Sequence, residues 1–436
     1  MSFLGVRNAV SLGVSPHVTL GGSNLLGRLS PSLILQFAGA QTLDPRITFT
    51  RSTTATFTGS DGLIQTAAID APRFDYNPTT LAPLGLLIEE QRVNLLLYSE
   101  EFDNAAWNKT LGTVTVTVAA NSTTSPDGTV NADKVITANA TGDHVIAQVA
   151  SVTSGTTYTQ SWFLKAAELN WVQVTESTGF GSTQFQNINL SDGTVGNGNY
   201  GSAVSVTSVG NGWYRVSVTD TATATSASGR FLVALLTSNV AARLTDVTGN
   251  GTDGVFIYGG QLEAGAFVTS YIPTVASQVT RAADVAVMTG TNFSSWYNAI
   301  EGTLYGQADW MGLSNNDYFF AINNGTSSNL IAIGVSSTPL TRFIVSDGGV
   351  TQASVNGPTP VANVAFKIAG AYQANSFAAA TNGTLGTVDT SGTVPSVNQV
   401  SLTSSSGTTN QFNGHIRQIV YYPRRLANAE LQGITA

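Results

Sequence analysis

The feature that most constrains this chain is the recurrence of Asn-Gly and Asp-Gly pairs between short alternating runs of apolar and polar residues. Runs such as residues 113–118 and 157–164 have the period of β-strands. Asn-Gly and Asp-Gly pairs both tolerate the positive φ that a tight hairpin demands. The chain is therefore predicted to be mainly β, with antiparallel sheets rather than βαβ units. The pairs begin at Asn197, Asn211, Asn250, Asn324, Asn356, Asn382 and Asn413, and at Asp61, Asp127, Asp192, Asp253 and Asp347.

The composition agrees with several β-rich cores. The 436 residues are enough for two or three domains, and the 42% of hydrophobic residues can fill their cores. Charged residues make up only 10%, against roughly 25% in ordinary soluble domains. Because the chain has no cysteine, neither disulfides nor thiolate metal sites can stabilise it. Burial, and with it subunit assembly, is expected to supply the stability.

The net charge of the chain argues against a nucleic-acid partner, and its hydropathy argues against membrane insertion. The formal net charge is −8, and the few Lys and Arg residues form no basic stripe, so no nucleic-acid partner is expected. No window approaches 18 consecutive apolar residues, and the first residues do not have the pattern of a secretion signal. We therefore expect synthesis in a cytoplasm, no membrane insertion, and a separate carrier for any role outside the cell.

Shifts in composition divide the chain into four segments. Residues 1–45 are rich in Gly, Ser and Leu with weak periodicity, and are interpreted as an extended N-terminal arm. Residues 46–93 are predicted to form a small β-rich junction unit, and residues 94–280 and 281–436 one sandwich domain each. This division predicts that a chain beginning at Asn94 would still fold.

Two blocks of sequence resemble a known family. Residues 48–107, which include TFTRSTTATFTGSDGLIQ and GLLIEEQRVNLLLY, resemble a block that recurs in phage and prophage head-spike or fibre proteins. Residues 254–274, with TRAAD at 280–284, resemble the closing strand and exit of the carbohydrate-binding-module-like jelly roll in the same proteins. The resemblance implies that residues 94–280 form such a jelly roll. It does not cover residues 1–45, which we expect to anchor the chain to a virion.

The ends of the last segment resemble a second family. EGTLYGQADW at 301–310 and GHIRQIVYYPRRLANAEL at 414–431 are similar to the ends of the concanavalin A-like, laminin-G-type sandwich. The expected fold is thus a mainly β chain of tandem antiparallel β-sandwich (jelly-roll) domains with an extended N-terminal arm. Residues 424–434 are the best candidate for a short helix.

The sequence offers little for catalysis. Concanavalin-like glucanases carry acids at alternate positions of one strand, and no Glu-x-Asp-x-Glu occurs here. His17, His144 and His415 have no metal-binding spacing, and we expect each to be structural or on the surface. We therefore expect no enzyme, no catalytic residue, no cofactor and no transition-metal site. A structural calcium ion is left open, because no loop has a diagnostic spacing.

Charged residues near the predicted junction have a structural interpretation. Glu89, Glu90 and Arg92 lie beside the apolar segment 84–88, where buried charge survives only with a partner. A structural ion pair at the domain junction is favoured over a catalytic role.

Carbohydrate binding requires an exposed aromatic ring with amides or carboxylates nearby. The candidates are Trp171, Trp310, Trp162 and Tyr305. Trp171 lies beside Asn170 and Gln173, and Trp310 follows Asp309, which makes these two the first choice. A Trp in a sandwich is nevertheless more often part of the core than of a ligand platform.

The family resemblance implies a function. It indicates a bacteriophage fibre or spike subunit on the virion surface, attached to head or tail, that binds host-surface polysaccharide as an adhesin. The expected partners are capsid or tail proteins and further copies of the chain, with a trimer as the first expectation. The alternatives are a purely structural capsid decoration or baseplate subunit and, third, a capsule depolymerase, which the missing acid pair disfavours.

Overall fold

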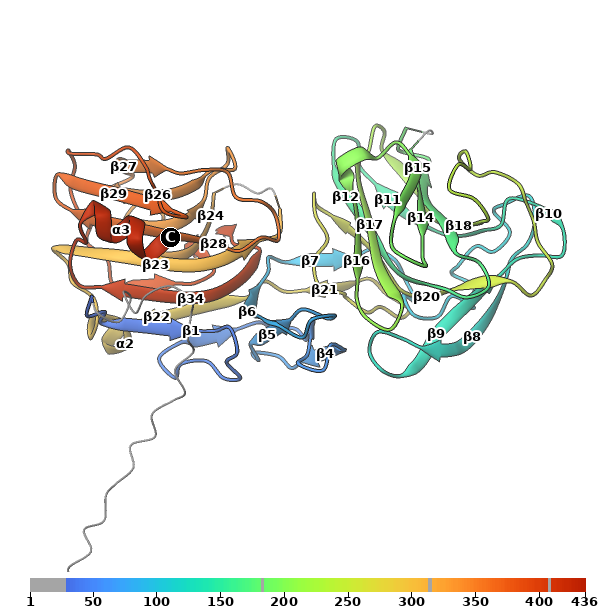
Figure 1. Ribbon diagram of the computed structural model, residues 1–436, viewed down its shortest axis with the longest axis horizontal. Coiled ribbons are helices and arrows are strands. Elements are labelled where there is room, and N and C mark those ends of the chain that lie inside the picture. Colours follow the sequence, from blue (N-terminus) through green and yellow to red (C-terminus); the bar gives the residue numbers. More distant parts are fainter. Residues whose placement is uncertain (1–28, 182–183, 313–315, 407–408) are drawn as a thin grey trace, which may run out of the picture.

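The computed structural model describes residues 29–181, 184–312, 316–406 and 409–436, and shows two β-sandwiches joined by a narrow waist (Figure 1). The predicted mainly β fold is confirmed. Most of the proposed anchoring arm lies outside the described residues. Within them, the helical elements are η1 (Gly201–Ala203), α2 (Gly290–Ser294) and α3 (Asn428–Thr435), the last of which confirms the short helix predicted near the end.

The first sandwich is a jelly roll of two antiparallel sheets. Its six-stranded sheet contains, in spatial order, β16 (Val204–Ser208), β17 (Trp213–Thr221), β12 (Thr157–Ala166), β20 (Gly254–Ala264), β9 (Val130–Ile136) and β8 (Thr117–Thr124). Its five-stranded sheet contains β11 (Val145–Val152), β18 (Ser226–Leu236), β13 (Trp171–Ser177), β14 (Phe185–Asn189) and β15 (Val195–Gly198). A two-stranded ribbon pairs β10 (Thr141–Gly142) with β19 (Val247–Thr248).

Alternation along β17 separates the core of the jelly roll from its outer surface. Val216 and Val218 point inward and are buried, whereas Arg215, Ser217 and Thr219 point to the outer face of the sheet. The inward residues join an aromatic centre in which the rings of Trp107 and Trp162 lie 5.7 Å apart. The polar outer face of this sheet is turned toward the second sandwich.

The second sandwich contains an eight-stranded and a nine-stranded sheet. The eight-stranded sheet is formed by β30 (Thr384–Leu385), β29 (Ser376–Thr381), β28 (Phe366–Gln373), β23 (Glu301–Trp310), β34 (Gly414–Tyr422), β6 (Pro83–Ile88) and β5 (Arg73–Tyr76), with β1 (Leu33–Gln36) also on β34. The nine-stranded sheet is formed by β2 (Thr48–Thr50), β22 (Val285–Thr289), β31 (Gln399–Ser401), β24 (Asp317–Asn323), β25 (Leu330–Val335), β26 (Thr341–Asp347) and β27 (Val350–Asn356), with β32 (Ser404–Ser406) and β33 (Thr409–Gln411) at its side.

The segment before residue 94 is built into the second sandwich, which differs from the division expected from sequence. Residues 33–36 pair antiparallel with β34, whereas the sequence predicts an extended arm over residues 1–45. Strands β2, β5 and β6 likewise extend the two sheets, and leave only the hairpin of β3 (Ala55–Thr58) and β4 (Ile64–Ala67) as a separate ribbon. The alternation of β1 explains its place, because Leu33 and Leu35 enter the core while Ile34 and Gln36 face outward.

The jelly roll is therefore an insertion into the second sandwich. The chain leaves that sandwich after β6 through β7 (Arg92–Asn94) and returns to it through β21 (Val279–Arg281). These two crossing strands pair antiparallel with each other, and together they form the waist of the molecule (Figure 1). The two sandwiches are thus connected by a hydrogen-bonded ribbon rather than by a single linker.

Several of the Gly pairs form the tight turns predicted from sequence. Asn211 and Gly212 have φ values of 52° and 77° between β16 and β17, and Asn382 and Gly383 have 46° and 78° between β29 and β30. Positive φ at both central residues matches the twist of the flanking strands in a two-residue hairpin. Gly254 differs, because it lies at the start of β20, where a Cβ would meet the Val135 carbonyl oxygen at 2.1 Å.

Candidate binding pocket between the sandwiches

Buried ion pairs fix the junction between the two sandwiches. Arg73 binds Glu89 and Asp284 at 2.6 Å each, and Arg281 binds Glu89 at 3.0 Å. Arg51 binds the other oxygen of Asp284 at 3.1 Å. All five side chains are buried, so each charge depends on its partners for compensation. Arg73 lies on β5 and Arg281 on β21, while Glu89 directly follows β6, and the ion-pair network therefore ties the waist to the second sandwich.

Glu89 is at the centre of this network. Burial by itself raises the pKa of its carboxyl, but the Arg281 and Arg73 guanidinium groups outweigh burial and hold the pKa at about 2. Ser270 adds two hydrogen bonds, from its backbone N–H and its hydroxyl, both 2.6 Å long. The structural role predicted for Glu89 is confirmed, and Glu90 and Arg92 form a second pair at 2.6 Å.

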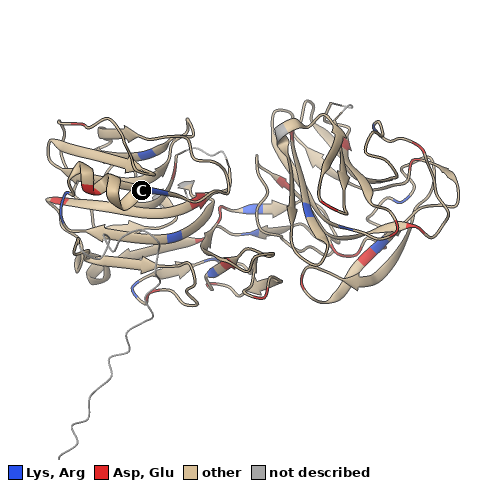
Figure 2. Cartoon of the chain, in the orientation of Figure 1, with Lys and Arg blue, Asp and Glu red and all other residues tan. Residues whose placement is uncertain are grey.

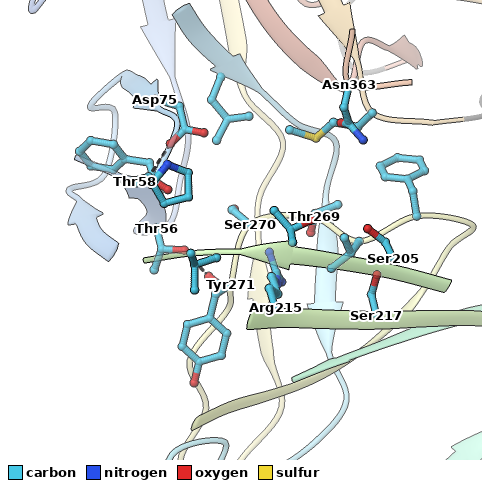
Figure 3. A pocket seen from close by; sticks show the side chains of 18 of the residues that line it. Thr56, Thr58, Asp75, Ser205, Arg215, Ser217, Thr269, Ser270, Tyr271 and Asn363 are labelled. Carbon is cyan, nitrogen blue, oxygen red and sulfur yellow. Dashed lines mark hydrogen bonds between the residues drawn. The ribbon is translucent and has the colours of Figure 1, made fainter. Parts of the chain in front are cut away.

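A pocket of about 690 Å³ opens above this network, between the jelly roll and the second sandwich (Figure 3). Its floor is the outer face of the jelly roll, where β17 contributes Arg215 and Ser217 and β16 contributes Ser205. One wall comes from the β3–β4 hairpin and β5, and the other from the segment 266–271 with Met311 and Asn363. Its volume lies within the range of roughly 300–1,000 Å³ of small-ligand sites.

Hydroxyl groups dominate the polar lining, and they fall into two sets. Thr56 and Thr269 are committed to the fold, since they donate to the Tyr271 carbonyl oxygen and to Glu263. The side-chain hydroxyls of Thr58, Ser205 and Ser217 make no hydrogen bond with any residue that the structure describes. The second set is therefore free to bind the hydroxyl groups of a ligand.

Apolar groups line the pocket beside these hydroxyls. Phe57 of the hairpin is half-buried, and Phe267 lies against the Arg92 guanidinium at 4.9 Å from its ring centroid. A ring with one accessible face can pack on the apolar face of a sugar. Phe57 meets this condition better than Phe267, whose side chain is buried.

His415 also borders the pocket, but its chemistry is already committed. Its Nδ1 lies 2.7 Å from Asp309 and its Nε2 lies 2.9 Å from Asp75. Burial lowers the pKa of the imidazole, yet the two carboxylates outweigh burial and raise it to about 10. Because both ring nitrogens donate to carboxylates, this imidazolium has no lone pair with which to accept a proton. His415 thus joins the β5 and β34 strands rather than serving as a general base.

Three of the four predicted sugar-binding rings are in the cores. Trp162 belongs to the aromatic centre of the jelly roll and Tyr305 packs under α3. Trp310 is buried and donates its indole N–H to Asp317 at 3.1 Å. Trp171 is half-buried and begins β13, the central strand of the five-stranded sheet. None of the four lines the pocket.

The pocket residues gave only a weak signal in the sequence. Ser205, Arg215 and Ser217 occupy alternate positions of two neighbouring strands, as any outward-facing polar residues would. The covering segment 266–271 and the Phe57 hairpin are distant in sequence, and only the insertion topology brings them to the same surface.

The described part of the chain is predicted to hold neither a transition-metal site nor a membrane span. There, no group of three or more His, Cys, Asp or Glu side chains is arranged to hold a metal ion. Among the same residues, no helix has the length and apolar character needed to cross a membrane.

About a third of this chain is similar in structure to each of several solved proteins. No family model and no curated protein matches the sequence. A carbohydrate-binding module (CBM40) of a Ruminococcus gnavus sialidase is similar at 15% identity and a TM-score of 0.29, over 33% of this chain and 88% of that chain. The NanB sialidase of Streptococcus pneumoniae (K499G mutant) is similar at 11% identity and a TM-score of 0.29, over 34% and 26%. The receptor-binding domain of a botulinum neurotoxin, mosaic serotype C/D, is similar at 13% identity and a TM-score of 0.27, over 35% and 39%.

The fold itself defines the class of protein. The chain is a tandem β-sandwich protein in which a jelly roll is inserted into a second, larger sandwich. A pocket lined by free hydroxyls lies between them.

Proposed function

We propose that this chain binds carbohydrate in the pocket between its sandwiches, as a fibre or spike subunit of a bacteriophage virion. The observation that carries the binding proposal is a pocket of about 690 Å³ whose free hydroxyls, half-buried phenyl ring and guanidinium come from the jelly roll and from the β3–β4 hairpin. Sugars present hydroxyl groups on one side and C–H groups on another, so this mixture of polar and apolar lining suits them.

The virion role rests on the sequence of residues 48–107, which resembles phage head-spike and fibre proteins. In this proposal the protein lies on the virion surface, its N-terminal segment contacts capsid or tail proteins, and the pocket meets host-surface polysaccharide. Charged residues are only 10% of the sequence, and Figure 2 shows them scattered along both sandwiches.

We also propose that the chain is not an enzyme. The acidic groups that line the pocket are Asp75, Glu89 and Asp309, and each already binds a cationic side chain within ion-pair distance. An acid–base pair for glycoside hydrolysis needs one carboxyl that can give up a proton and one that is free to attack or to activate water. These three groups are occupied in structural ion pairs instead.

The binding proposal is tested by filling the pocket. Ser205→Trp places a large ring at an exposed floor position of β16, and we expect it to lower affinity for a bound bacterial polysaccharide at least tenfold. The matched control is Ser208→Trp, at an exposed position of the same strand that does not line the pocket. An array of capsular and O-antigen polysaccharides identifies the ligand, and calorimetry compares the variants.

Each outcome separates one alternative. Unchanged binding by Ser205→Trp with loss of binding by Trp171→Ala would move the site to the Trp171 surface. If no polysaccharide is retained, a purely structural capsid decoration or baseplate subunit becomes the better explanation. Release of reducing ends from a retained polysaccharide would instead indicate a depolymerase.

A further inference from the structure

The charged groups that line the pocket are unevenly paired. They are Asp75, Glu89, Asp309, Arg215 and His415. The three carboxylates and the imidazolium are all joined in ion pairs of 3.0 Å or shorter. Arg215, by contrast, has no carboxylate within ion-pair distance among the residues that the structure describes. It is therefore the one charged lining group whose counter-ion is missing from the described part of the fold.

The Arg215 side chain is nevertheless held in place. Its Nη2 donates to the Ser161 hydroxyl at 3.2 Å, and its guanidinium carbon lies 5.2 Å from the centroid of the Phe163 ring. Phe163 stands directly opposite Arg215 in the β12–β17 register. The buried Nε has no hydrogen-bond partner among the described residues. A fixed, planar donor group with unused N–H groups is organised in advance for a ligand.

The two acids that act electrostatically on Arg215 are Glu263 and Glu89, and both bind other groups. Glu263 accepts hydrogen bonds from the Thr269 backbone N–H, at 3.1 Å, and from its hydroxyl. Glu89 is shared between Arg73 and Arg281. Burial lowers the pKa of the Arg215 guanidinium, against the opposite influence of Glu263 and Glu89. An arginine stays protonated in proteins, so the half-buried site keeps a positive charge that is incompletely compensated.

We propose that Arg215 binds the anionic group of an acidic sugar, so that the glycan held in this pocket carries a uronic or ulosonic acid, or an acidic ester. This inference rests on the proposed carbohydrate-binding function. The guanidinium fork matches the two oxygens of a carboxylate, sulfate or phosphate. Ser217 is two residues further along the same face of β17, where its free hydroxyl can bind the ring hydroxyls of the same sugar.

The test uses probes that share a sugar backbone and differ in charge. Trigalacturonic acid, its carboxyl-reduced neutral counterpart and a sulfated galactotriose are titrated into the full chain by calorimetry, beside the acidic and neutral polysaccharides of the array. We expect at least tenfold tighter binding of an acidic ligand than of its neutral counterpart, because a hydrogen bond to a charged group contributes more than about 1.4 kcal/mol. The acidic probe that binds distinguishes a carboxylate from a sulfate.

Variants separate recognition from folding. Arg215→Gln removes the charge without leaving a carboxylate unpaired, so the thermal midpoint is expected to change little while the preference for acidic ligands disappears. Arg215→Lys is expected to keep part of the preference, because Lys retains the charge but not the fork. The matched control is Arg230→Gln on β18, which lies away from the pocket and should behave like wild type.

The outcomes distinguish this inference from the function on which it rests. Equal affinity for charged and neutral ligands, or an Arg215→Gln variant that keeps the acidic preference, would overturn the role of Arg215 and leave carbohydrate binding in place. Binding of no glycan, neutral or acidic, would overturn both.

Discussion

Individual charges matter unusually in this chain because there are so few of them. Only 10% of the residues are charged, yet five of them form one buried network where the waist meets the second sandwich: Arg51, Arg73, Glu89, Arg281 and Asp284. Lys or Arg positions, coloured blue, lie on the strands of the waist in Figure 2. A buried charge is tolerated only with its partner, so removing one member is expected to cost far more than removing a surface charge.

The imidazolium of His415 makes stability sensitive to alkaline pH. Its pKa is raised from 6.5 to about 10 by Asp309 and Asp75, against burial, so the folded chain binds this proton more tightly than the unfolded chain. The stabilisation is complete below about pH 6.5 and is lost as the pH rises toward 10. The difference in free energy of unfolding between wild type and the His415→Gln variant should therefore become smaller between pH 7 and pH 9.5, by at most about 1.4 kcal/mol per pH unit. Urea unfolding at both pH values measures it.

A difference that stays constant over this range would mean that His415 is not protonated in the folded state. Glu176 does not mimic the effect in this comparison. Burial raises the pKa of its carboxyl to about 8, but it is present in both wild type and variant, so its contribution cancels.

At the scale of elements, the strands before residue 94 complete a sandwich whose other strands follow residue 284. Leu33, Leu35, Phe74, Leu86 and Ile88 belong to the same buried cluster as the strands of the second sandwich. The edge of β34 pairs with β6 at residues 414–416 and with β1 at residues 418–421. Two short strands thus cover one long edge, which would otherwise expose unpaired backbone groups.

A chain beginning at Asn94 is therefore expected to lose the second sandwich and keep the jelly roll, contrary to the expectation from composition. The truncation removes β1, β2, β5 and β6 and leaves Asp284 and Arg281 buried without Arg73 and Glu89. Limited proteolysis should spare a fragment near residues 95–278 and digest residues 281–436. The isolated fragment 95–278 is the control, since its two sheets are self-contained.

Protection of both sandwiches in the truncated chain would show that the N-terminal strands are dispensable. In that case the second sandwich would have to cover the β34 edge by another route.

At the scale of the whole molecule, the insertion connects the two sandwiches twice. Two paired strands cross the waist, and Glu89, which directly follows β6, joins Arg73 of β5 to Arg281 of β21. The pocket depends on this arrangement, because its floor belongs to the jelly roll while Asp75, Asp309 and His415 in its lining belong to the second sandwich. A ligand in the pocket would contact both.

We expect the chain to act as a homo-oligomer, with a trimer as the first expectation from its resemblance to phage fibres. Repeated weak sites on one particle can raise avidity by about 10² to 10⁴ without any new contact. Mass photometry of the purified chain should give a multiple of 45.3 kDa. A strict monomer, both free and on the particle, would contradict the predicted oligomer. The affinity for glycan would then come from a single pocket.

The sequence by itself determined the class of fold and the chemistry of the junction. Asn211 and Asn382 precede Gly residues and form tight turns, because this pair accepts positive φ without help from the rest of the chain. Glu89 beside an apolar strand required a buried partner wherever the fold supplied one. Local conformational preference and the cost of burying charge are properties of a few neighbouring residues, so both can be predicted from sequence.

Only the tertiary structure decided which rings are buried and where the pocket lies. Trp162 and Tyr305 occupy strand positions that alternation alone allows to face core or solvent, and their burial depends on which second layer covers each face. Arg215 and Phe57 come from segments more than 150 residues apart, and the insertion of the jelly roll brings them to the same pocket. Burial and proximity depend on long-range packing, which no local pattern encodes.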